Sequence, residues 1–253
     1  SRGLGDVYKR QPQRLKRYNL ENKFKHLQRL AITAAKEAIM ETGQNNKVKI
    51  AGCFSPLPGS YFKDKSISKQ EMIETYSSIA DLQKDDVDFF IIETMSSVDE
   101  AVSAVEALSN FNKEIILCFC LSEGDGTKLF SGENLKEACD SIQIDKIYGL
   151  CLNCSQIEDI SKGLDILKKY NLPYGALPNN FKSVKPLKLG MSVDNIKKRN
   201  DILIDDFVNY AISWLNNECT ILGGCCEITP DYINGLNNYF CLLYTSPSPR
   251  DPS

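Results

Sequence analysis

The feature that most constrains the fold is a regular alternation of short apolar runs with segments of helical periodicity. Six apolar runs predict strands, at residues 48–54, 86–93, 114–120, 146–152, 172–177 and 219–222. Apolar residues that recur every three or four positions predict helices, at residues 14–41, 69–84, 98–111, 134–142, 157–169, 202–215 and after Pro230. Strands that alternate with helices in this way predict a parallel sheet with right-handed crossovers.

Composition excludes several classes of function. The chain has 253 residues and a formal net charge of −3, so there is no basic excess and nucleic acid is not an expected partner. No apolar run is long enough to span a membrane, and the first residues do not resemble a signal peptide. Ten cysteines without a secretion signal predict a reducing, cytoplasmic location with mostly free thiols. The sequence indicates no oligomeric state.

The chain contains one histidine, His26, which lies among charged residues within the predicted helix 14–41. A surface or half-buried position is expected for it. A single histidine excludes a histidine-rich metal site, and nothing places His26 near the motifs described below. The chemistry of the chain is therefore expected to depend on cysteines and carboxylates.

Two adjacent cysteines follow the last predicted strand. The apolar run ends in two glycines, and the chain continues with Cys225, Cys226 and a helix start at Thr229 and Pro230. Glycines there permit unusual backbone angles and a close approach of other groups. A disulfide between neighbouring residues would need strained geometry. The two thiols either converge on one metal ion or are simply small buried residues.

A third thiol occupies an equivalent position after the predicted strand 146–152. Cys154 follows Asn153, and a helix is predicted to begin near Ser155, with Glu158 three residues on in a capping-box spacing. The carboxyl ends of parallel strands meet at one edge of a sheet, where α/β proteins place their chemistry. Three thiolates at this edge form a catalytic rather than a structural zinc site, because a fourth position stays open for substrate.

These motifs together resemble those of the homocysteine S-methyltransferase family. The matching segments are Asn153-Cys154, the glycine pair with Cys225 and Cys226, and the strand that ends in Glu93-Thr94. The loop 55–61 and the strand end 178–180 also resemble segments of that family. The resemblance runs from about residue 14 to about residue 240.

The resemblance implies an α/β fold, the (β/α)8 or TIM barrel. The family's first two strands have no counterpart here, so residues 12–240 are expected to form a partial homocysteine-binding barrel domain. Residues 1–11 and 241–253 are expected to be non-native or disordered ends. The tail is rich in proline and serine, and no residue after Phe240 is expected to pack well.

The resemblance also implies a function. Zn²⁺ held by Cys154, Cys225 and Cys226 binds the thiol of homocysteine, and Glu93 binds its ammonium group. The thiol accepts a methyl group from a sulfonium donor, S-methylmethionine or S-adenosylmethionine, to give methionine. No catalytic residue beyond the metal site is implied. From the sequence alone, Glu93 is equally well explained as a strand-end residue that caps a helix or faces water.

Two alternatives stay open. The donor is of the betaine type, or the chain is a catalytically inactive or redox thiol protein on the same scaffold. The spacing of Cys151 and Cys154 matches a Cys-x-x-Cys redox pair, although Cys151 lies within a strand rather than at a helix start. The remaining cysteines within strands and helices are expected to be packing residues.

Overall fold

The computed structural model of the chain describes residues 12–16, 18–44, 47–57, 61, 67–187 and 196–245. Its centre is a six-stranded parallel sheet in the order β1-β2-β3-β6-β7-β8. The strands are β1 (Ala51–Phe54), β2 (Phe89–Met95), β3 (Ile115–Phe119), β6 (Gly149–Asn153), β7 (Tyr174–Leu177) and β8 (Ile221–Leu222). The predicted parallel α/β sheet is confirmed, with one strand for each apolar run.

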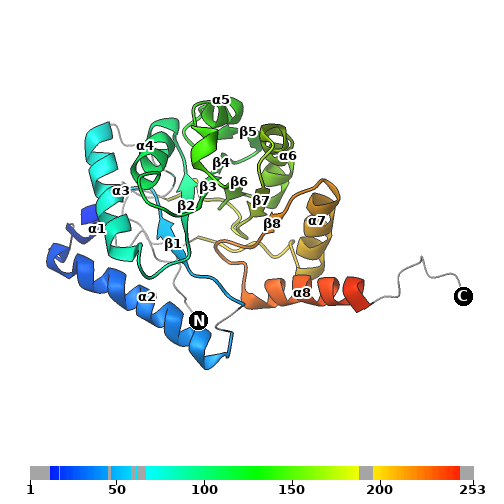
Figure 1. Cartoon of the computed structure of the whole chain (residues 1–253). Coiled ribbons are helices and arrows are strands. Elements are labelled where there is room, and N and C mark those ends of the chain that lie inside the picture. The colour runs from blue at the N-terminus through cyan, green and yellow to red at the C-terminus, as the bar shows by residue number, and fades with distance from the viewer. Residues whose placement is uncertain are drawn as a thin grey trace, which may run out of the picture.

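Helices lie in an arc around the strands, with α2 and α8 at the two ends of the arc (Figure 1). The longer helices are α2 (Phe24–Glu41), α3 (Lys69–Gln83), α4 (Val98–Leu108), α6 (Ile157–Leu167), α7 (Ile204–Asn216) and α8 (Pro230–Thr245). Shorter helices are α1 (Pro12–Lys16), α5 (Leu135–Asp140), η2 (Glu21–Lys23), η3 (Ile144–Lys146) and η4 (Lys168–Tyr170). No helix in the described part of the chain has the length and apolar character that a membrane crossing requires.

The two faces of the sheet differ in burial. In β2, Phe90 and Ile92 are fully buried, whereas the alternate residues Ile91 and Glu93 are only half-buried. Side chains alternate along a strand, so Phe90 and Ile92 face the helices and Glu93 faces the inner side. The helix side also holds the sole tryptophan, Trp214, which is 3% exposed and donates a hydrogen bond of 2.9 Å to Ser161 Oγ. Trp214 is thus a core residue.

The prediction of one helix over residues 14–41 is wrong. The segment forms α1, then a turn, then η2 and α2. Asn19 in the turn has a φ of 55°, a left-handed conformation that asparagine tolerates better than most residues and that ends a helix. The Leu20 amide closes the turn on the Leu15 carbonyl at 3.0 Å. His26 lies on α2 and is exposed, as expected.

The glycine-rich segment after β3 forms an antiparallel hairpin of β4 (Leu121–Ser122) and β5 (Asp125–Leu129), with Gly124 at a φ of 82° in its turn. Helix α8 continues to Thr245, past the expected end of the domain at Phe240, and no proline or glycine lies between Phe240 and Pro247 to stop it earlier. Residues 1–11 and 246–253 lie outside the described residues.

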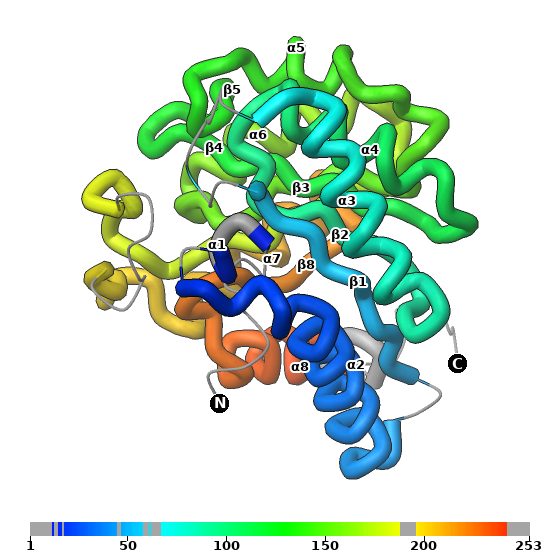
Figure 2. The backbone as a smooth tube through the Cα atoms, turned by 90° about the vertical axis from the view of Figure 1, so that its left-hand side faces the viewer, coloured from blue at the N-terminus to red at the C-terminus, as the bar shows by residue number. Residues whose placement is uncertain are grey.

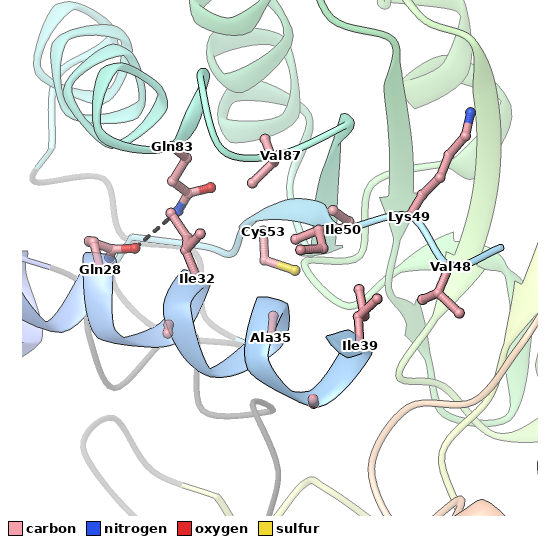
Figure 3. A pocket seen from close by; sticks show the side chains of 13 residues that line it. Gln28, Ile32, Ala35, Ile39, Val48, Lys49, Ile50, Cys53, Gln83 and Val87 are labelled. Carbon is pink, nitrogen blue, oxygen red and sulfur yellow. Dashed lines mark hydrogen bonds between the residues drawn. The ribbon is translucent and has the colours of Figure 1, made fainter. Parts of the chain in front are cut away.

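Strands β1 and β8 form the two edges of the sheet and pair on one side only within the described residues. Helix α2 lies beside β1 (Figure 2). A cavity of about 350 Å³ remains between them, into which Cys53, Ile32 and Ile39 point (Figure 3). At one end Gln83 Nε2 donates to Gln28 Oε1 at 3.0 Å. Closure of these edges into an eight-stranded barrel stays a prediction.

Candidate metal centre

Three sulfur atoms meet at the carboxyl edge of the sheet. The Sγ atoms of Cys154, Cys225 and Cys226 all lie within 4.8 Å of one another, and the Cys154 and Cys226 sulfurs are 3.7 Å apart. Two sulfurs bound to one tetrahedral zinc at about 2.3 Å are about 3.8 Å apart, so this spacing fits the ion. Cys154 is buried, whereas Cys225 and Cys226 are half-buried. The cluster therefore keeps one accessible side.

The three strand ends at this edge share an unusual backbone conformation. Thr94 after Glu93, Cys154, and Glu227 after the cysteine pair have φ values of 61°, 50° and 64°. Residues with side chains rarely adopt positive φ, and such strain is commonly found at functional sites. Cys154 directly follows β6, Thr94 lies where the pairing of β2 with β3 shifts register, and Glu227 follows the cysteine pair after β8. The three positive φ values thus mark departures from regular strand structure beside the motif residues.

Side-chain hydrogen bonds join two of these strand ends. Asn153 Oδ1 accepts a hydrogen bond from the Thr94 amide at 2.8 Å, and Asn153 Nδ2 donates to Thr94 Oγ1 at 3.1 Å. Asn153 is 1% exposed, and a buried amide side chain with both ends satisfied fixes its neighbours firmly. The end of β2, with Glu93, is therefore held in register with the end of β6, with Cys154.

Glu93 lies on the inner face of β2, toward the sulfur cluster. Burial and the negative charge of Cys154 raise the pKa of its carboxyl group to about 7. A carboxylate in a poorly solvated site gains more from a cationic partner than one in water, because water competes less for it. The position of Glu93 is thus suited to bind an ammonium group beside the sulfurs.

The sulfur of Cys154 is stabilised as a thiolate. Hydrogen bonds from Cys225, Cys226 and Tyr61 hold the pKa of Cys154 well below that of an ordinary thiol. The hydrogen bond with Cys154 raises the pKa of Cys225. A thiol whose pKa is lowered, as that of Cys154 is, gives up its proton to a metal more readily.

The strand end after β7 connects the two cysteine motifs. Asn179 Nδ2 donates to the Cys154 carbonyl at 2.7 Å, and the Cys225 amide donates to the Pro178 carbonyl at 2.8 Å. The Asn180 amide donates to the Cys226 carbonyl at 3.0 Å. Strand β7 lies between β6 and β8, so this segment sets the separation of the thiols.

We expect Asn179→Ala to weaken metal binding. The variant removes the shortest of the side-chain hydrogen bonds to the buried Cys154 carbonyl, which costs about 0.5–1.5 kcal/mol of folding stability. It also loosens the left-handed Cys154 backbone, and loss of a supporting contact of this kind lowers metal affinity about 10- to 100-fold. Zinc titration against a chelator measures the affinity. Asn110→Ala, which removes an exposed side-chain to backbone bond far from the site, is the control. Equal affinities in Asn179→Ala and wild type would contradict the assignment.

Two local predictions are corrected. The capping box of Ser155 and Glu158 does not form, because Gln156 is the N-cap of α6. Ser155 Oγ instead accepts from the Leu121 amide at 2.7 Å, and Glu158 pairs with Arg199 at 2.7 Å. The described backbone shows no positive φ at the glycines before the cysteine pair. Gly224 is required by close approach, since a Cβ there would lie 2.2 Å from Ile228 Cγ2.

Cys151 and Cys154 do not face each other as a redox pair. Cys151 lies on the inner face of β6, opposite Cys118 of β3 in the strand register, and both are fully buried. A hydrogen bond with Cys151 contributes to the raised pKa of Cys118, after burial as the main cause. The neighbours of the Cys154 sulfur are the two thiols of the β8 motif and Tyr61. The Cys-x-x-Cys spacing arises because Cys151 lies within β6 and Cys154 lies in the turn after it. It does not indicate a redox pair.

Tyr61 and Asn179 were not among the predicted site residues. Both lie in segments that resembled the family, the loop 55–61 and the strand end 178–180. The sequence did carry a signal for them. Each residue follows a predicted strand at the edge of the sheet where the cysteines lie. Residues 58–60, also in that loop, lie outside the described residues.

The parallel sheet and its edge cluster define an α/β protein with a three-cysteine candidate metal site. A sequence profile described as homocysteine S-methyltransferase matches residues 6–240. The chain belongs to the homocysteine S-methyltransferase family.

Individual relatives agree with the family assignment. A selenocysteine methyltransferase of Astragalus bisulcatus is 29% identical over 157 residues, which cover 59% of this chain and 44% of that protein. Homocysteine S-methyltransferase 2 of Arabidopsis thaliana is 28% identical over 165 residues, 62% of this chain and 46% of that protein. The chain thus spans less than half the length of these curated relatives.

A solved structure shares the fold. The crystal structure of the metallated homocysteine methyltransferase MmuM from Escherichia coli superposes with a TM-score of 0.70 at 21% identity. The superposition covers 92% of this chain and 77% of the MmuM chain.

Proposed function

We propose that the chain carries the homocysteine site of a zinc-dependent methyltransferase that produces methionine. The observation that carries this proposal is the meeting of three sulfurs, those of Cys154, Cys225 and Cys226, at the sheet edge that also bears Glu93. Family membership supports the same reaction class.

The donor set favours zinc as the metal. Thiolates are soft ligands that select zinc or copper(I) over magnesium and calcium, and three protein ligands with an accessible side suit a catalytic zinc ion. Bound there, zinc supplies the Lewis acidity that lowers the pKa of a substrate thiol. All ten cysteines are free thiols and nine of them are buried or half-buried, and we propose a reducing, cytoplasmic location on this ground.

The residues around the cluster bind and orient homocysteine. Glu93 accepts hydrogen bonds from the substrate ammonium and fixes the amino acid end of the molecule. Asn153 holds the Glu93 strand end relative to Cys154, so ammonium and thiol are positioned by one rigid unit. The half-buried Cys225 and Cys226 border the side from which substrate enters.

We propose a sulfonium as the methyl donor, either S-methylmethionine or S-adenosylmethionine, with betaine as the second candidate. The homocysteine thiol releases its proton to solvent, its sulfur forms the new bond to the methyl carbon, and the bond from that carbon to the donor sulfur breaks. The electron pair of the broken bond stays on the donor sulfur, which becomes neutral. The chain needs no general base for this step, which agrees with the absence of any described histidine at the site.

The test is methionine formation from homocysteine by the zinc-loaded protein with each of the three donors in turn, followed by mass spectrometry. Methionine with one sulfonium donor supports the proposal, and methionine with betaine alone corrects the donor. Loss of activity in Cys151→Ser together with full activity in Cys226→Ser would favour the redox alternative and overturn the proposal.

A further inference from the structure

A largely buried carboxylate on the β4–β5 hairpin bonds to the segment that follows β7. Glu123 lies in the hairpin turn, and 11% of its side chain is exposed. Its Oε2 accepts a hydrogen bond from Ser183 Oγ at 2.8 Å, and its Oε1 accepts one from the Val184 amide at 2.5 Å. The Lys185 ammonium is 3.8 Å from Oε2, but that side chain is mostly exposed. Glu123 thus anchors the segment 181–187 near its middle, mainly through hydrogen bonds.

The hairpin that carries Glu123 is itself fixed on α6. The Gly124 amide donates to Asp159 Oδ2 at 2.8 Å, and Asp159 is 2% exposed. Gly126 lies so close to this helix that a Cβ there would be 2.4 Å from the Asp159 carbonyl oxygen. The hairpin lies beside α6 in Figure 1. Because the hairpin is held without help from the segment 181–187, Glu123 is the fixed partner of the contact and the segment is the part that it positions.

The segment 181–187 supplies apolar side chains to the sulfur cluster. Phe181 and Val184 are 2% and 4% exposed and belong to one apolar cluster with Cys154. The half-buried Leu187 packs against the same cluster, as does the cysteine pair. These side chains keep water from one side of the sulfurs. Exclusion of water strengthens electrostatic interactions at the site, and it favours a step in which a thiolate and a cationic donor lose their charges.

We propose that Glu123 is a positioning residue, whose carboxylate holds the segment 181–187 so that its apolar side chains cover the sulfur cluster. This inference rests on the proposed function, because it assumes that the covered sulfurs bind zinc and serve methyl transfer. Glu123 supplies no ligand to the three-sulfur group and acts through the position of Val184. Its loss should therefore uncover the site without removing a metal ligand.

The experiment compares wild type with Glu123→Gln and Ser183→Ala, which weaken the same contact from its two sides. Glu123→Gln keeps the shape of the side chain and removes its charge, and Ser183→Ala removes one donor. Lys185→Ala is the control, because it removes only the exposed cation. The first measurement is the rate of zinc release from the loaded protein to a chromogenic chelator. The second is the rate of tryptic cleavage after Lys182 in the metal-free protein, followed by mass spectrometry, and circular dichroism checks the fold.

We expect both zinc release and cleavage after Lys182 to be about 10-fold faster in Glu123→Gln. The loss of a charge-assisted hydrogen bond raises the population of the opened segment by about this factor. Ser183→Ala should change both rates in the same direction by a smaller factor. Zinc bound at saturation should stay at about one ion per chain in both variants. Lys185→Ala should keep the wild-type rates.

Wild-type rates in both Glu123→Gln and Ser183→Ala would overturn the role of Glu123. Faster cleavage with unchanged zinc release would overturn it as well, because the segment would then be anchored without covering the metal. A wild-type protein that binds zinc but forms no methionine with any donor would overturn the proposed function, and the two rates would still decide the role of Glu123. Folded wild-type protein that takes up no zinc would overturn the metal centre and this inference together.

Discussion

Cys154→Ser is expected to abolish methyl transfer to homocysteine while the chain stays folded. A serine hydroxyl is a weak ligand for zinc, and at this position it stays protonated at neutral pH. Removing a metal that contributes several kcal/mol of transition-state stabilisation lowers the rate by roughly 1,000-fold or more. The fold should persist because serine has nearly the same size and can keep the hydrogen bond to Tyr61. Steady-state kinetics with homocysteine and the preferred donor measure the effect.

The matched control is Cys120→Ser. Cys120 is buried beside Cys154 and donates to its carbonyl oxygen at 3.6 Å, yet its sulfur is not part of the three-sulfur group. A serine hydroxyl can make the same donation, so the variant should retain most activity and its full metal content. If Cys120→Ser loses as much activity as Cys154→Ser, the three-sulfur assignment is wrong.

Glu93→Gln is expected to weaken homocysteine binding without removing the metal. The change keeps the shape of the side chain and removes the charge, so a charge-assisted hydrogen bond to the ammonium group becomes a neutral one. The expected loss is about 2 kcal/mol, which corresponds to roughly a 30-fold higher KM for homocysteine. Zinc content and the KM for the donor should be unchanged, which separates substrate binding from metal binding.

Glu114→Gln is the control for this prediction. Glu114 lies at the amino end of β3, on the side of the sheet away from the sulfur cluster, and is exposed. Its charge therefore does not reach the site. An unchanged KM for homocysteine in Glu93→Gln would show that Glu93 is only a strand-end residue that faces the inner side, which is the simpler explanation left open by the sequence.

The sheet was predictable because its strands consist of apolar runs that must be buried. In β3 and β6 the runs around Leu117 and Leu150 are continuously apolar, as parallel strands with both faces covered require. Strand order was available only through the tendency of successive strands to lie side by side, and the order in the structure follows it. Elements whose form depends on one backbone angle were not predictable. Asn19 breaks the first helix with a positive φ, and nothing in the surrounding pattern distinguishes it from a helical asparagine.

The cysteines of the candidate site were predictable because the carboxyl ends of parallel strands lie at one edge of the sheet, and this does not depend on how the side chains pack. Cys154 and the cysteine pair each follow an apolar run, and this position alone brings them together. Tyr61 and Asn179 were not predicted as site residues because their contacts depend on side-chain direction. Tyr61 bonds to a residue 93 positions away, and Asn179 bonds to a carbonyl whose orientation follows from the left-handed Cys154.

The most direct test of the account is the zinc content of the folded chain, measured by elemental analysis for wild type and for Cys226→Ser, with circular dichroism on both. If the three thiolates bind zinc, the wild-type chain holds about one zinc ion. The Cys226→Ser variant loses that ion, and its circular dichroism spectrum is unchanged. A folded wild-type chain without zinc, or a Cys226→Ser variant that retains it, would contradict the metal centre at the end of β6 and β8.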